Sequence, residues 1–375
     1  MGTILTRPPG HRRDVVLRPA ATARVYLGPG QAHETIAVPG VALGDGDVLV
    51  AIELSTVCAA DVRAAHGQAS APVPLVPGHE SVGRVIAVGD DGVRAADGAE
   101  LRVGDRVVWS TSAACGDCAH CRRGMPQVCA ALVLYGHRRI GGDGELSGAF
   151  ASHVQLRPGT VIVRVPETLP AAVLAPASCA TATAWAAVAR AARHGALRGA
   201  RLRVHGAGLI GLTAAAIAAE QGAVVDVRDP EDARRRRAPA FGATVFEGEP
   251  DVVVATTGGV ASAVAEVAAG GIVVLVGGPH ADVPPSADPE DDPACPGPLA
   301  LDVADLAARL VTVAGVQRPG PDDLVEAVAF LAGRGRAYPF GEAVGAVHRL
   351  SALDEALAAA SAPDAPPRTG LVPGP

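Results

Sequence analysis

Seven cysteines are the residues of this 375-residue chain with the most chemistry to offer. They stand at positions 58, 115, 118, 121, 129, 179 and 295. The opening "MGTILTRPPGHRRDVVLRP" contains no apolar run of signal-peptide length, so we expect the protein to be cytoplasmic. In a reducing compartment, cysteines serve as metal ligands or free thiols before they form disulfides.

Four cysteines lie together in the segment "CGDCAHCRRGMPQVC", with the spacing Cys-x2-Cys-x2-Cys-x7-Cys. They are Cys115, Cys118, Cys121 and Cys129. Four thiolates in one loop with Gly and Pro are typical of a closed tetrahedral zinc site. An iron–sulfur cluster or free thiols are the alternatives, but the spacing matches no ferredoxin pattern. We therefore expect a structural zinc lobe at residues 115–129, with no open position for catalysis.

A second motif begins at residue 201, where the chain reads "RLRVHGAGLIGLTAAAIAAEQGAVVDVRD". A short apolar strand leads into a glycine-rich turn, and an Ala-rich helix follows. The turn consists of Gly206, Gly208, Leu209, Ile210 and Gly211 around one alanine. Glycines in this pattern let a pyrophosphate approach the helix N-terminus, where unpaired N–H groups favour anions.

Asp229 stands 18 residues after the last glycine of this turn, at the end of a second apolar strand. A carboxylate there can accept from both ribose hydroxyls and repels a 2′-phosphate, which favours NAD over NADP. Arg228 and the arginines that follow leave NADP open. The further runs "DVVVATTG" and "GGIVVLVGG" look like buried parallel strands, so we expect a doubly wound sheet. A glycine-rich turn in some other α/β protein is the alternative.

The remaining cysteines form a less obvious pattern with one histidine. Cys58 is followed 21 residues later by His79 and Glu80 in "GHE", and Cys179 lies in "APASCATATAW". Taken singly, a buried cysteine is often a small core residue, and a single histidine is usually structural. The conjunction of all three motifs favours a second metal site.

With these motifs the chain resembles the zinc-dependent medium-chain alcohol dehydrogenases over nearly its whole length. The resemblance runs from "VLVAIELSTVCAAD" through "PLVPGHESVGRVIAVG", the four-cysteine lobe and the glycine-rich turn to "PPRTG" near the C-terminus. It implies that Cys58, His79 and Cys179 hold a catalytic zinc with one position open to substrate. It further implies that Asp61 orients His79 and that Glu80 lies behind the metal.

The same resemblance implies two cofactor contacts and a domain arrangement. Thr183 would contact the nicotinamide, and Arg368 would approach the pyrophosphate. We expect a GroES-like twisted β-barrel catalytic domain at residues 22–180 and 336–375, and a Rossmann NAD-binding domain at 181–335. Residues 1–21 would form a loose N-terminal extension. By resemblance alone, the protein should form a homodimer or homotetramer with two zinc ions per chain.

The expected activity is hydride transfer between NAD(H) and a small polar alcohol or its carbonyl product. Family members often carry Ser or Thr, and further along His, as proton carriers where this chain has Ala60 and Arg63. Three explanations stay open: water or a substrate hydroxyl carries the proton, another residue does so, or the substrate is a conjugated carbonyl or iminium ion. A non-catalytic dinucleotide-binding protein is a weaker alternative. Segments such as "YGHRR" also look similar to a phosphonate-catabolism-associated branch.

Composition excludes several classes of partner. The net charge of −7 and the pI near 5.9 provide no basic face for nucleic acid. The uncharged span 168–189 contains two prolines and several hydroxyl side chains, so we expect it inside the protein and not in a membrane. The Pro- and Asp-rich segment 277–302 looks like an inserted loop that caps the cleft or lines a subunit contact, with Cys295 as a free thiol.

Overall fold

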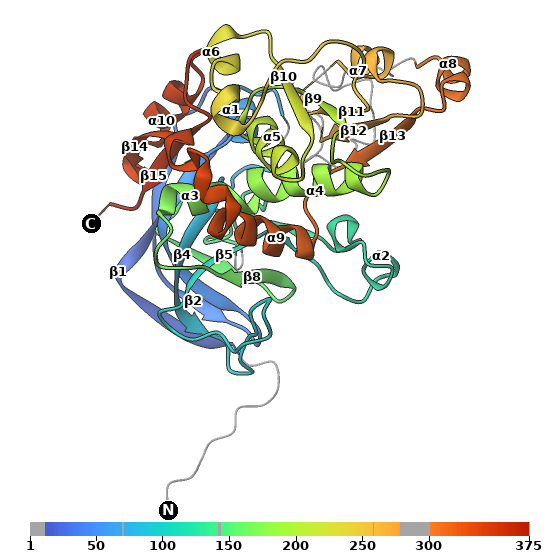
Figure 1. Ribbon diagram of the computed structural model, residues 1–375. Helices are drawn as coiled ribbons and strands as arrows, with labels where there is room; N and C mark the ends of the chain where they lie inside the picture. Colours follow the sequence, from blue (N-terminus) through green and yellow to red (C-terminus); the bar gives the residue numbers. More distant parts are fainter. Residues whose placement is uncertain (1–11, 70, 142–143, 258, 278–300, 375) are drawn as a thin grey trace, which may run out of the picture.

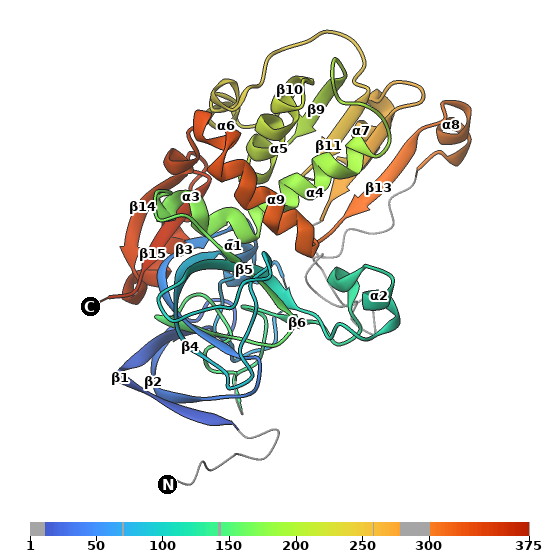
Figure 2. The same cartoon turned by 60° about the horizontal axis from the view of Figure 1, so that its bottom comes forward.

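Two β-sheets with different topologies form the centre of the molecule, as a computed structural model of residues 12–69, 71–141, 144–257, 259–277 and 301–374 shows (Figures 1 and 2). One sheet is curled and mixed, and the other is parallel with helices packed against it. The inserted segment expected at 277–302, including Cys295, lies outside the described residues except at its two ends.

The curled sheet has eight strands in the order β14-β15-β3-β4-β5-β6, with β7 paired to β3 and β8 paired to β5. Its pairs are antiparallel except β14 with β15. The strands are β3 (Val48–Val57), β4 (Ser81–Val88), β5 (Arg106–Ala113), β6 (Val133–Leu134), β7 (His153–Leu156), β8 (Thr160–Arg164), β14 (Val344–Arg349) and β15 (Arg368–Val372). β14 and β15 follow the strands of the parallel sheet along the chain, so the curled sheet combines segments from both sides of the parallel sheet in the sequence.

A separate antiparallel pair, β1 (Arg13–Val25) and β2 (Glu34–Leu43), lies beside the curled sheet. Alternating burial along β1 places Ala21, Ala23 and Val25 in a core shared with the curled sheet. Residues 13–21 belong to β1 and are therefore not part of the loose extension that was expected at 1–21. Period-two alternation was present in this stretch but is broken by the Pro19 region, where the register shifts.

The parallel sheet has the order β10-β9-β11-β12-β13, and all its pairs are parallel. Its strands are β9 (Arg201–His205), β10 (Val224–Arg228), β11 (Val252–Ala255), β12 (Ile272–Val276) and β13 (Thr312–Val316). β11 is buried along its whole length, as continuous Val runs in parallel sheets predict. Strand order reverses between β9 and β11, which creates a crevice at their carboxyl ends where ligands of such sheets bind.

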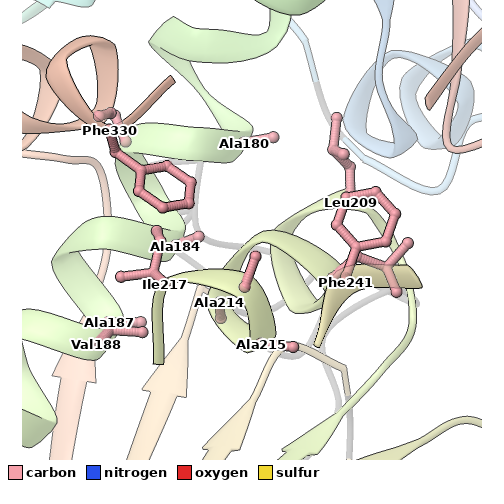
Figure 3. Packing of buried hydrophobic residues seen from close by; sticks show 14 of the residues in the cluster. Ala180, Ala184, Ala187, Val188, Leu209, Ala214, Ala215, Ile217, Phe241 and Phe330 are labelled. Atoms are coloured by element: carbon pink, nitrogen blue, oxygen red, sulfur yellow. The ribbon is translucent and has the colours of Figure 1, made fainter. Parts of the chain in front are cut away.

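Helices pack against this sheet through small side chains. α4 (Ala180–Ala192) contacts α5 (Leu209–Glu220) and α9 (Pro321–Ala332). Figure 3 shows the alanines of α4 facing those of α5, with Phe330 of α9 filling the space at their side. The other helices are α1 (Ala59–Ala65), α2 (Ala119–Arg122), α3 (Ala171–Leu174), α6 (Asp232–Arg235), α7 (Val260–Glu266), α8 (Val303–Ala308) and α10 (Leu353–Ala360).

The apolar span 168–189 supplies part of this core, and residues 180–184 are all buried. Among the described residues, no single helix is long and apolar enough to cross a membrane, although the bent pair Ala171–Ser178 and Ala180–Ala192 meets the length and composition together. The domain boundaries at 180/181 and 335/336 stay a prediction.

Candidate active site

The ends of two neighbouring strands bring the first candidate ligands together. Cys58 follows directly after β3, and His79 lies two residues before β4. These strands pair antiparallel with Ser55 opposite Ser81, so both side chains lie at the same end of the sheet. The Cys58 Sγ atom is 3.5 Å from His79 Nε2.

The third candidate, Cys179, arrives from the 3₁₀ turn Ala175–Ser178 that precedes α4. Ser178 Oγ donates to the His79 carbonyl oxygen at 3.2 Å, and the Cys179 side chain hydrogen-bonds that of His79. The fold therefore brings Cys58, His79 and Cys179 together, as expected. Ligand atoms of Cys58, Asp61 and His79 also lie within 4.8 Å of one another.

The donor set fits a zinc ion. With Zn–S near 2.3 Å and Zn–N near 2.1 Å, two ligands of a tetrahedral zinc are about 3.6 Å apart, close to the observed 3.5 Å. Burial raises the pKa of the Cys58 thiol, and it raises that of Cys179 to about 12. Burial alone would lower the pKa of His79, but Cys179 and Asp61 outweigh it and raise the value to about 10. Burial therefore favours protonated thiols, and a bound divalent cation would instead favour the thiolates that coordinate it.

The Asp61 carboxylate mainly binds a backbone N–H group. Its Oδ2 atom accepts from the Cys58 N–H at 2.8 Å, and Cys58 Sγ accepts from the Ala60 N–H at 3.3 Å, which together cap α1. Asp61 Oδ1 lies 3.8 Å from His79 Nδ1, beyond hydrogen-bond range, and this buried Nδ1 atom has no hydrogen-bond partner among the described residues. Asp61 therefore fixes the position of Cys58, and its expected hydrogen bond to His79 is not formed here.

Glu80 and Arg368 form a buried ion pair beside these ligands. Arg368 donates from Nε and Nη2 to the two Glu80 oxygens at 2.6 and 2.7 Å, and Thr56 Oγ1 donates to the same carboxylate at 2.6 Å. Burial raises the pKa of Glu80, but the Arg368 guanidinium outweighs it and holds the value below its usual range. Glu80 lies close to the ligands, as expected. The expected contact of Arg368 with pyrophosphate is not supported, because its guanidinium faces Glu80.

A small cavity of about 30 Å³, measured as space for the centres of water-sized spheres, opens beside α1. Its α1 wall consists of Ala60, Asp61, Ala64 and Ala65, so this helix contributes a carboxylate but no hydroxyl group. His137, whose ring centre is 6.1 Å from that of His79, lines the same cavity. His33 lines it as well. The cavity therefore lies beside the candidate metal site, next to Asp61 and His137, and combines small apolar side chains with imidazoles and a carboxylate.

The four-cysteine lobe has a different geometry. Its Sγ atoms are 3.4 Å apart for Cys115 and Cys129, 3.6 Å for Cys118 and Cys121, 3.9 Å for Cys118 and Cys129, and 4.0 Å for Cys115 and Cys121. Two thiolates on one tetrahedral zinc are about 3.8 Å apart, so the four residues fit a closed site. Backbone N–H groups of Cys121 and Ala130 lower the pKa of Cys118 to about 6, which favours the thiolate that a metal requires.

The glycine-rich turn follows β9 at the switch point of the parallel sheet. Gly206 has a left-handed φ of 103°, and a Cβ added to Gly211 would lie 1.8 Å from the Gly206 carbonyl oxygen. A Cβ added to Gly208 would meet nothing within 4 Å. Leu209 and Ile210 begin α5 at this point. The fold itself therefore requires glycine at positions 206 and 211. Gly208 instead leaves free space where a pyrophosphate would approach.

Asp229 follows β10 and is 7% exposed. Its oxygens accept from the N–H groups of Ala207 and Glu231 at 2.8 and 2.9 Å. Each carboxylate oxygen accepts more than one hydrogen bond, so the ribose contact expected from the sequence is compatible with this position. Thr183 is buried in the first turn of α4, and its N–H donates to the Cys179 carbonyl oxygen at 2.9 Å.

One feature near the site carried no sequence signal. His33 and Asp354 form a hydrogen-bonded pair, although 321 positions separate them. The pair belongs to no motif, so only the folded structure reveals it. Arg63, which the sequence had singled out, has a buried Nε atom with no hydrogen-bond partner in the described part of the chain.

Comparisons with known proteins agree with this geometry. Residues 44–167 match the family model of the alcohol dehydrogenase GroES-like domain. An alcohol dehydrogenase from Geobacillus stearothermophilus is 30% identical over 322 residues, or 80% of this chain and 85% of that protein. An L-threonine 3-dehydrogenase from Streptomyces coelicolor is 36% identical over 225 residues, or 58% of this chain and 60% of that protein.

The fold is also found in solved structures. An alcohol dehydrogenase from Thermotoga maritima superposes with a TM-score of 0.82 at 24% identity, covering 94% of this chain and 99% of that one. This agreement confirms the expected fold class, a GroES-like curled sheet combined with a Rossmann-like parallel sheet.

Proposed function

The chain belongs to the zinc-dependent medium-chain alcohol dehydrogenase family, and from this premise we propose that it transfers a hydride between NAD(H) and a small polar alcohol or its carbonyl product. The observation that carries the proposal is the 3.5 Å approach of Cys58 Sγ to His79 Nε2 beside a cavity lined by Ala60. The family acts on CH–OH groups with NAD(P), and the open substrate position distinguishes such a site from a closed structural one.

Cys58, His79 and Cys179 would hold the catalytic zinc, and the lobe cysteines the structural one. When bound, the catalytic zinc polarises the alcohol or carbonyl oxygen. The protein's own part is to place the substrate carbon against the nicotinamide, with Thr183 at the start of α4 as the proposed contact. Burial of the ligands keeps competing water out of the site.

We propose a secondary alcohol next to a polar group as the substrate class. The cavity supports this choice because alanine side chains line it together with the imidazoles of His33 and His137 and the Asp61 carboxylate. The related L-threonine 3-dehydrogenase, by its name, acts on such an alcohol. A hydroxyalkylphosphonate is a narrower candidate, because segments such as "YGHRR" look similar to a phosphonate-catabolism-associated branch.

For the cofactor we propose NAD, supported by the Asp229 carboxylate at the end of β10. A 2′-phosphate would meet this negative charge, whereas ribose hydroxyls can donate to it. The free space at Gly208 supports dinucleotide binding. We therefore expect the Gly208→Ala variant to fold normally and yet to bind NADH more weakly. Gly211→Ala should instead disturb the fold itself.

The direct test is a substrate panel with the zinc-loaded protein, followed by nicotinamide absorbance. The panel holds ethanol, propan-2-ol, L-threonine, butane-2,3-diol, glycerol and 2-hydroxypropylphosphonate, each with NAD⁺ and with NADP⁺. We expect the polar secondary alcohols to react fastest, with NAD⁺ preferred. Absence of turnover with every alcohol, and with the matching aldehydes and ketones in the reverse direction, would reject the proposal.

We also propose a homodimer that pairs through β13. This strand is the edge of the parallel sheet among the described residues, and Val313 on it is exposed. An unpaired strand edge offers N–H and C=O groups to a second copy. Light scattering tests the stoichiometry, and Val313→Lys should favour the monomer if the edge forms the contact.

A further inference from the structure

We propose that Arg237 is a positioning residue for the cofactor, because it ties the segment that follows Asp229 to the loop that leads to Arg368. The inference rests on the proposed function. Arg237 ends the run "RRRR" at positions 234–237, which follows β10 of the parallel sheet. The loop at 362–367 leads into β15 of the curled sheet. The tie therefore joins the two parts of the molecule that are built on the two sheets.

The tie consists of two hydrogen bonds from one nitrogen atom. Arg237 Nη2 donates to the carbonyl oxygens of Asp364 and Ala365, at 3.0 Å in each case. Hydrogen bonds from a charged guanidinium are stronger than those between neutral groups. Both acceptors are backbone atoms, so the tie depends on the course of the loop and on no partner side chain. Arg237 thereby contacts residues that lie 127 and 128 positions further along the chain.

The segment between Asp229 and Arg237 is short and bonded within itself. Asp229 Oδ1 accepts from the Glu231 N–H at 2.9 Å, and Arg235 Nη1 donates to the Asp229 carbonyl oxygen. α6 occupies the middle of the segment, and the Arg237 N–H donates to the Arg234 carbonyl oxygen at 3.1 Å. Because each part is bonded to the next, a tie at the end of this segment acts on the carboxylate at its beginning.

The backbone that carries Arg237 is anchored in the core. Ala238 and Phe241, in the 3₁₀ turn that follows, are each 4% exposed. The Phe241 ring packs edge-on against that of Phe340, with 5.3 Å between the ring centres. The Arg237 side chain therefore extends from a fixed position, so less conformational freedom is lost when it forms its two hydrogen bonds.

The loop that receives the tie leads directly to the candidate metal site. The Ala365 N–H donates to the Ala362 carbonyl oxygen at 3.0 Å, which closes a turn. Three residues after this turn, Arg368 begins β15 and pairs with Glu80 through two hydrogen bonds. Glu80 is the neighbour of His79 in the chain. The tie therefore connects the segment of the expected ribose contact with the segment that supports the metal ligands.

This connection fixes the spacing between the two parts near Asp229. A cofactor that is held at Asp229 and reacts at the metal site fits only a narrow range of spacings, because hydride transfer requires close contact. Without the tie, the two parts should adopt this spacing for a smaller share of the time, and the apparent affinity falls by the same factor. Once the cofactor is bound, its own contacts hold the two parts together. The tie should therefore affect cofactor binding and leave kcat nearly unchanged.

NADH binding by the zinc-loaded protein tests the tie without any alcohol. We expect Arg237→Gln to raise the dissociation constant of NADH, measured by fluorescence titration, about tenfold. KM for NAD⁺ should rise by a similar factor, and kcat should stay within about twofold of wild type. Arg237→Met also removes the donor but keeps the apolar stem, so it should bind NADH as weakly. Arg237→Lys keeps a charged nitrogen and should recover part of the affinity.

Arg334→Gln is the matched control. Arg334 is an exposed arginine whose Nη1 also donates to a backbone carbonyl oxygen, that of Glu220, at 3.3 Å. Glu220 is the last residue of α5 and lies at the opposite end of this helix from the glycine-rich turn. Loss of this bond leaves Asp229 and the loop at 362–367 in place. The NADH dissociation constant of this variant should therefore equal that of wild type, and thermal unfolding should show every variant folded.

Two results would overturn the proposal. One is a folded Arg237→Gln or Arg237→Met variant with the wild-type dissociation constant for NADH. The other is a loss of kcat at saturating NAD⁺ as large as the loss of affinity, with Arg237→Lys equally impaired, because that pattern marks a general loss of structure. If the wild-type protein binds neither NADH nor NADPH, the proposed function fails and this inference with it. The two results above leave the proposed function standing.

Discussion

Residues 115–129 bring four thiols together within one loop, whereas Cys58, His79 and Cys179 meet only because β3, β4 and the turn before α4 converge. The lobe projects from the body of the molecule, as Figure 2 shows around α2, and Cys115 is exposed. Cys58 is buried and its N–H is held by Asp61. A site whose ligands all come from one loop can be lost while the rest of the fold remains. A site whose ligands come from several elements depends on the core that holds those elements together.

Cys58→Ser tests the buried half of this comparison and should have the largest effect. A serine hydroxyl is a poor zinc ligand, and the metal's stabilisation of charge is worth several kcal/mol, so kcat/KM should fall at least about 10³-fold. Metal analysis should show one zinc ion retained in the lobe, and thermal unfolding should change little. Full activity in this variant would contradict the assignment of the catalytic metal site.

Glu80→Gln tests whether the core supports the buried site. The substitution leaves the Arg368 charge buried without its partner, which costs about 3 to 5 kcal/mol in such pairs. Urea unfolding of both proteins measures the difference. Glu167→Gln is the matched control, because Glu167 pairs with Arg84 by two similar hydrogen bonds at the surface, where little change is expected.

The same pair gives a pH dependence of defined sign. The folded-state pKa of Glu80 lies below its ordinary value of 4.5, so its contribution to stability is present above that pH. The contribution is lost as the pH falls through the lower, folded-state value. The stability difference between wild type and Glu80→Gln should therefore shrink in acid, and a difference that stays constant would contradict the assigned role of the carboxylate.

The lobe and the glycine-rich turn could be predicted from the sequence because their geometry is local. Three- and eight-residue spacings determine which thiols can meet, and a strand, a glycine turn and a helix are consecutive. The buried site could be predicted only through the family resemblance, since 21 residues separate Cys58 from His79 and 99 separate His79 from Ser178. No periodicity encodes which strand ends converge.

Contacts between residues far apart in the chain could not be predicted from the sequence. Arg368 was expected at a pyrophosphate, but pairing of β15 with β3 places it against Glu80. Asp61 was expected to bind His79, yet its position in the first turn of α1 directs it to the Cys58 N–H. The pairing of His33 with Asp354 requires β2 and α10 to meet, which depends on the complete core.

Alkylation compares a cysteine of the four-cysteine lobe with a cysteine of the buried site. With zinc removed, iodoacetamide at pH 7 should label Cys118 at least about tenfold faster than Cys179. The thiolate is the nucleophile, and the pKa is lowered to about 6 for Cys118 by backbone hydrogen bonds but raised to about 12 for Cys179 by burial. Labelling of Cys118 should slow below pH 6. Peptide mass spectrometry gives both rates, and equal rates in the folded protein would contradict the contrast.

Cys118→Ser should have the smallest effect on activity, because the lobe supplies no residue to the cavity or to the Cys58 site. The variant should lose one zinc ion and become sensitive to trypsin at Arg122 and Arg123, since a lobe of this size has little apolar core of its own. kcat/KM should change less than about tenfold. His120→Gln, in the same lobe but not among the four thiols, should keep the zinc and resist trypsin. If Cys118→Ser instead loses both zinc ions and as much activity as Cys58→Ser, the two centres are coupled through the fold and the lobe is not self-contained.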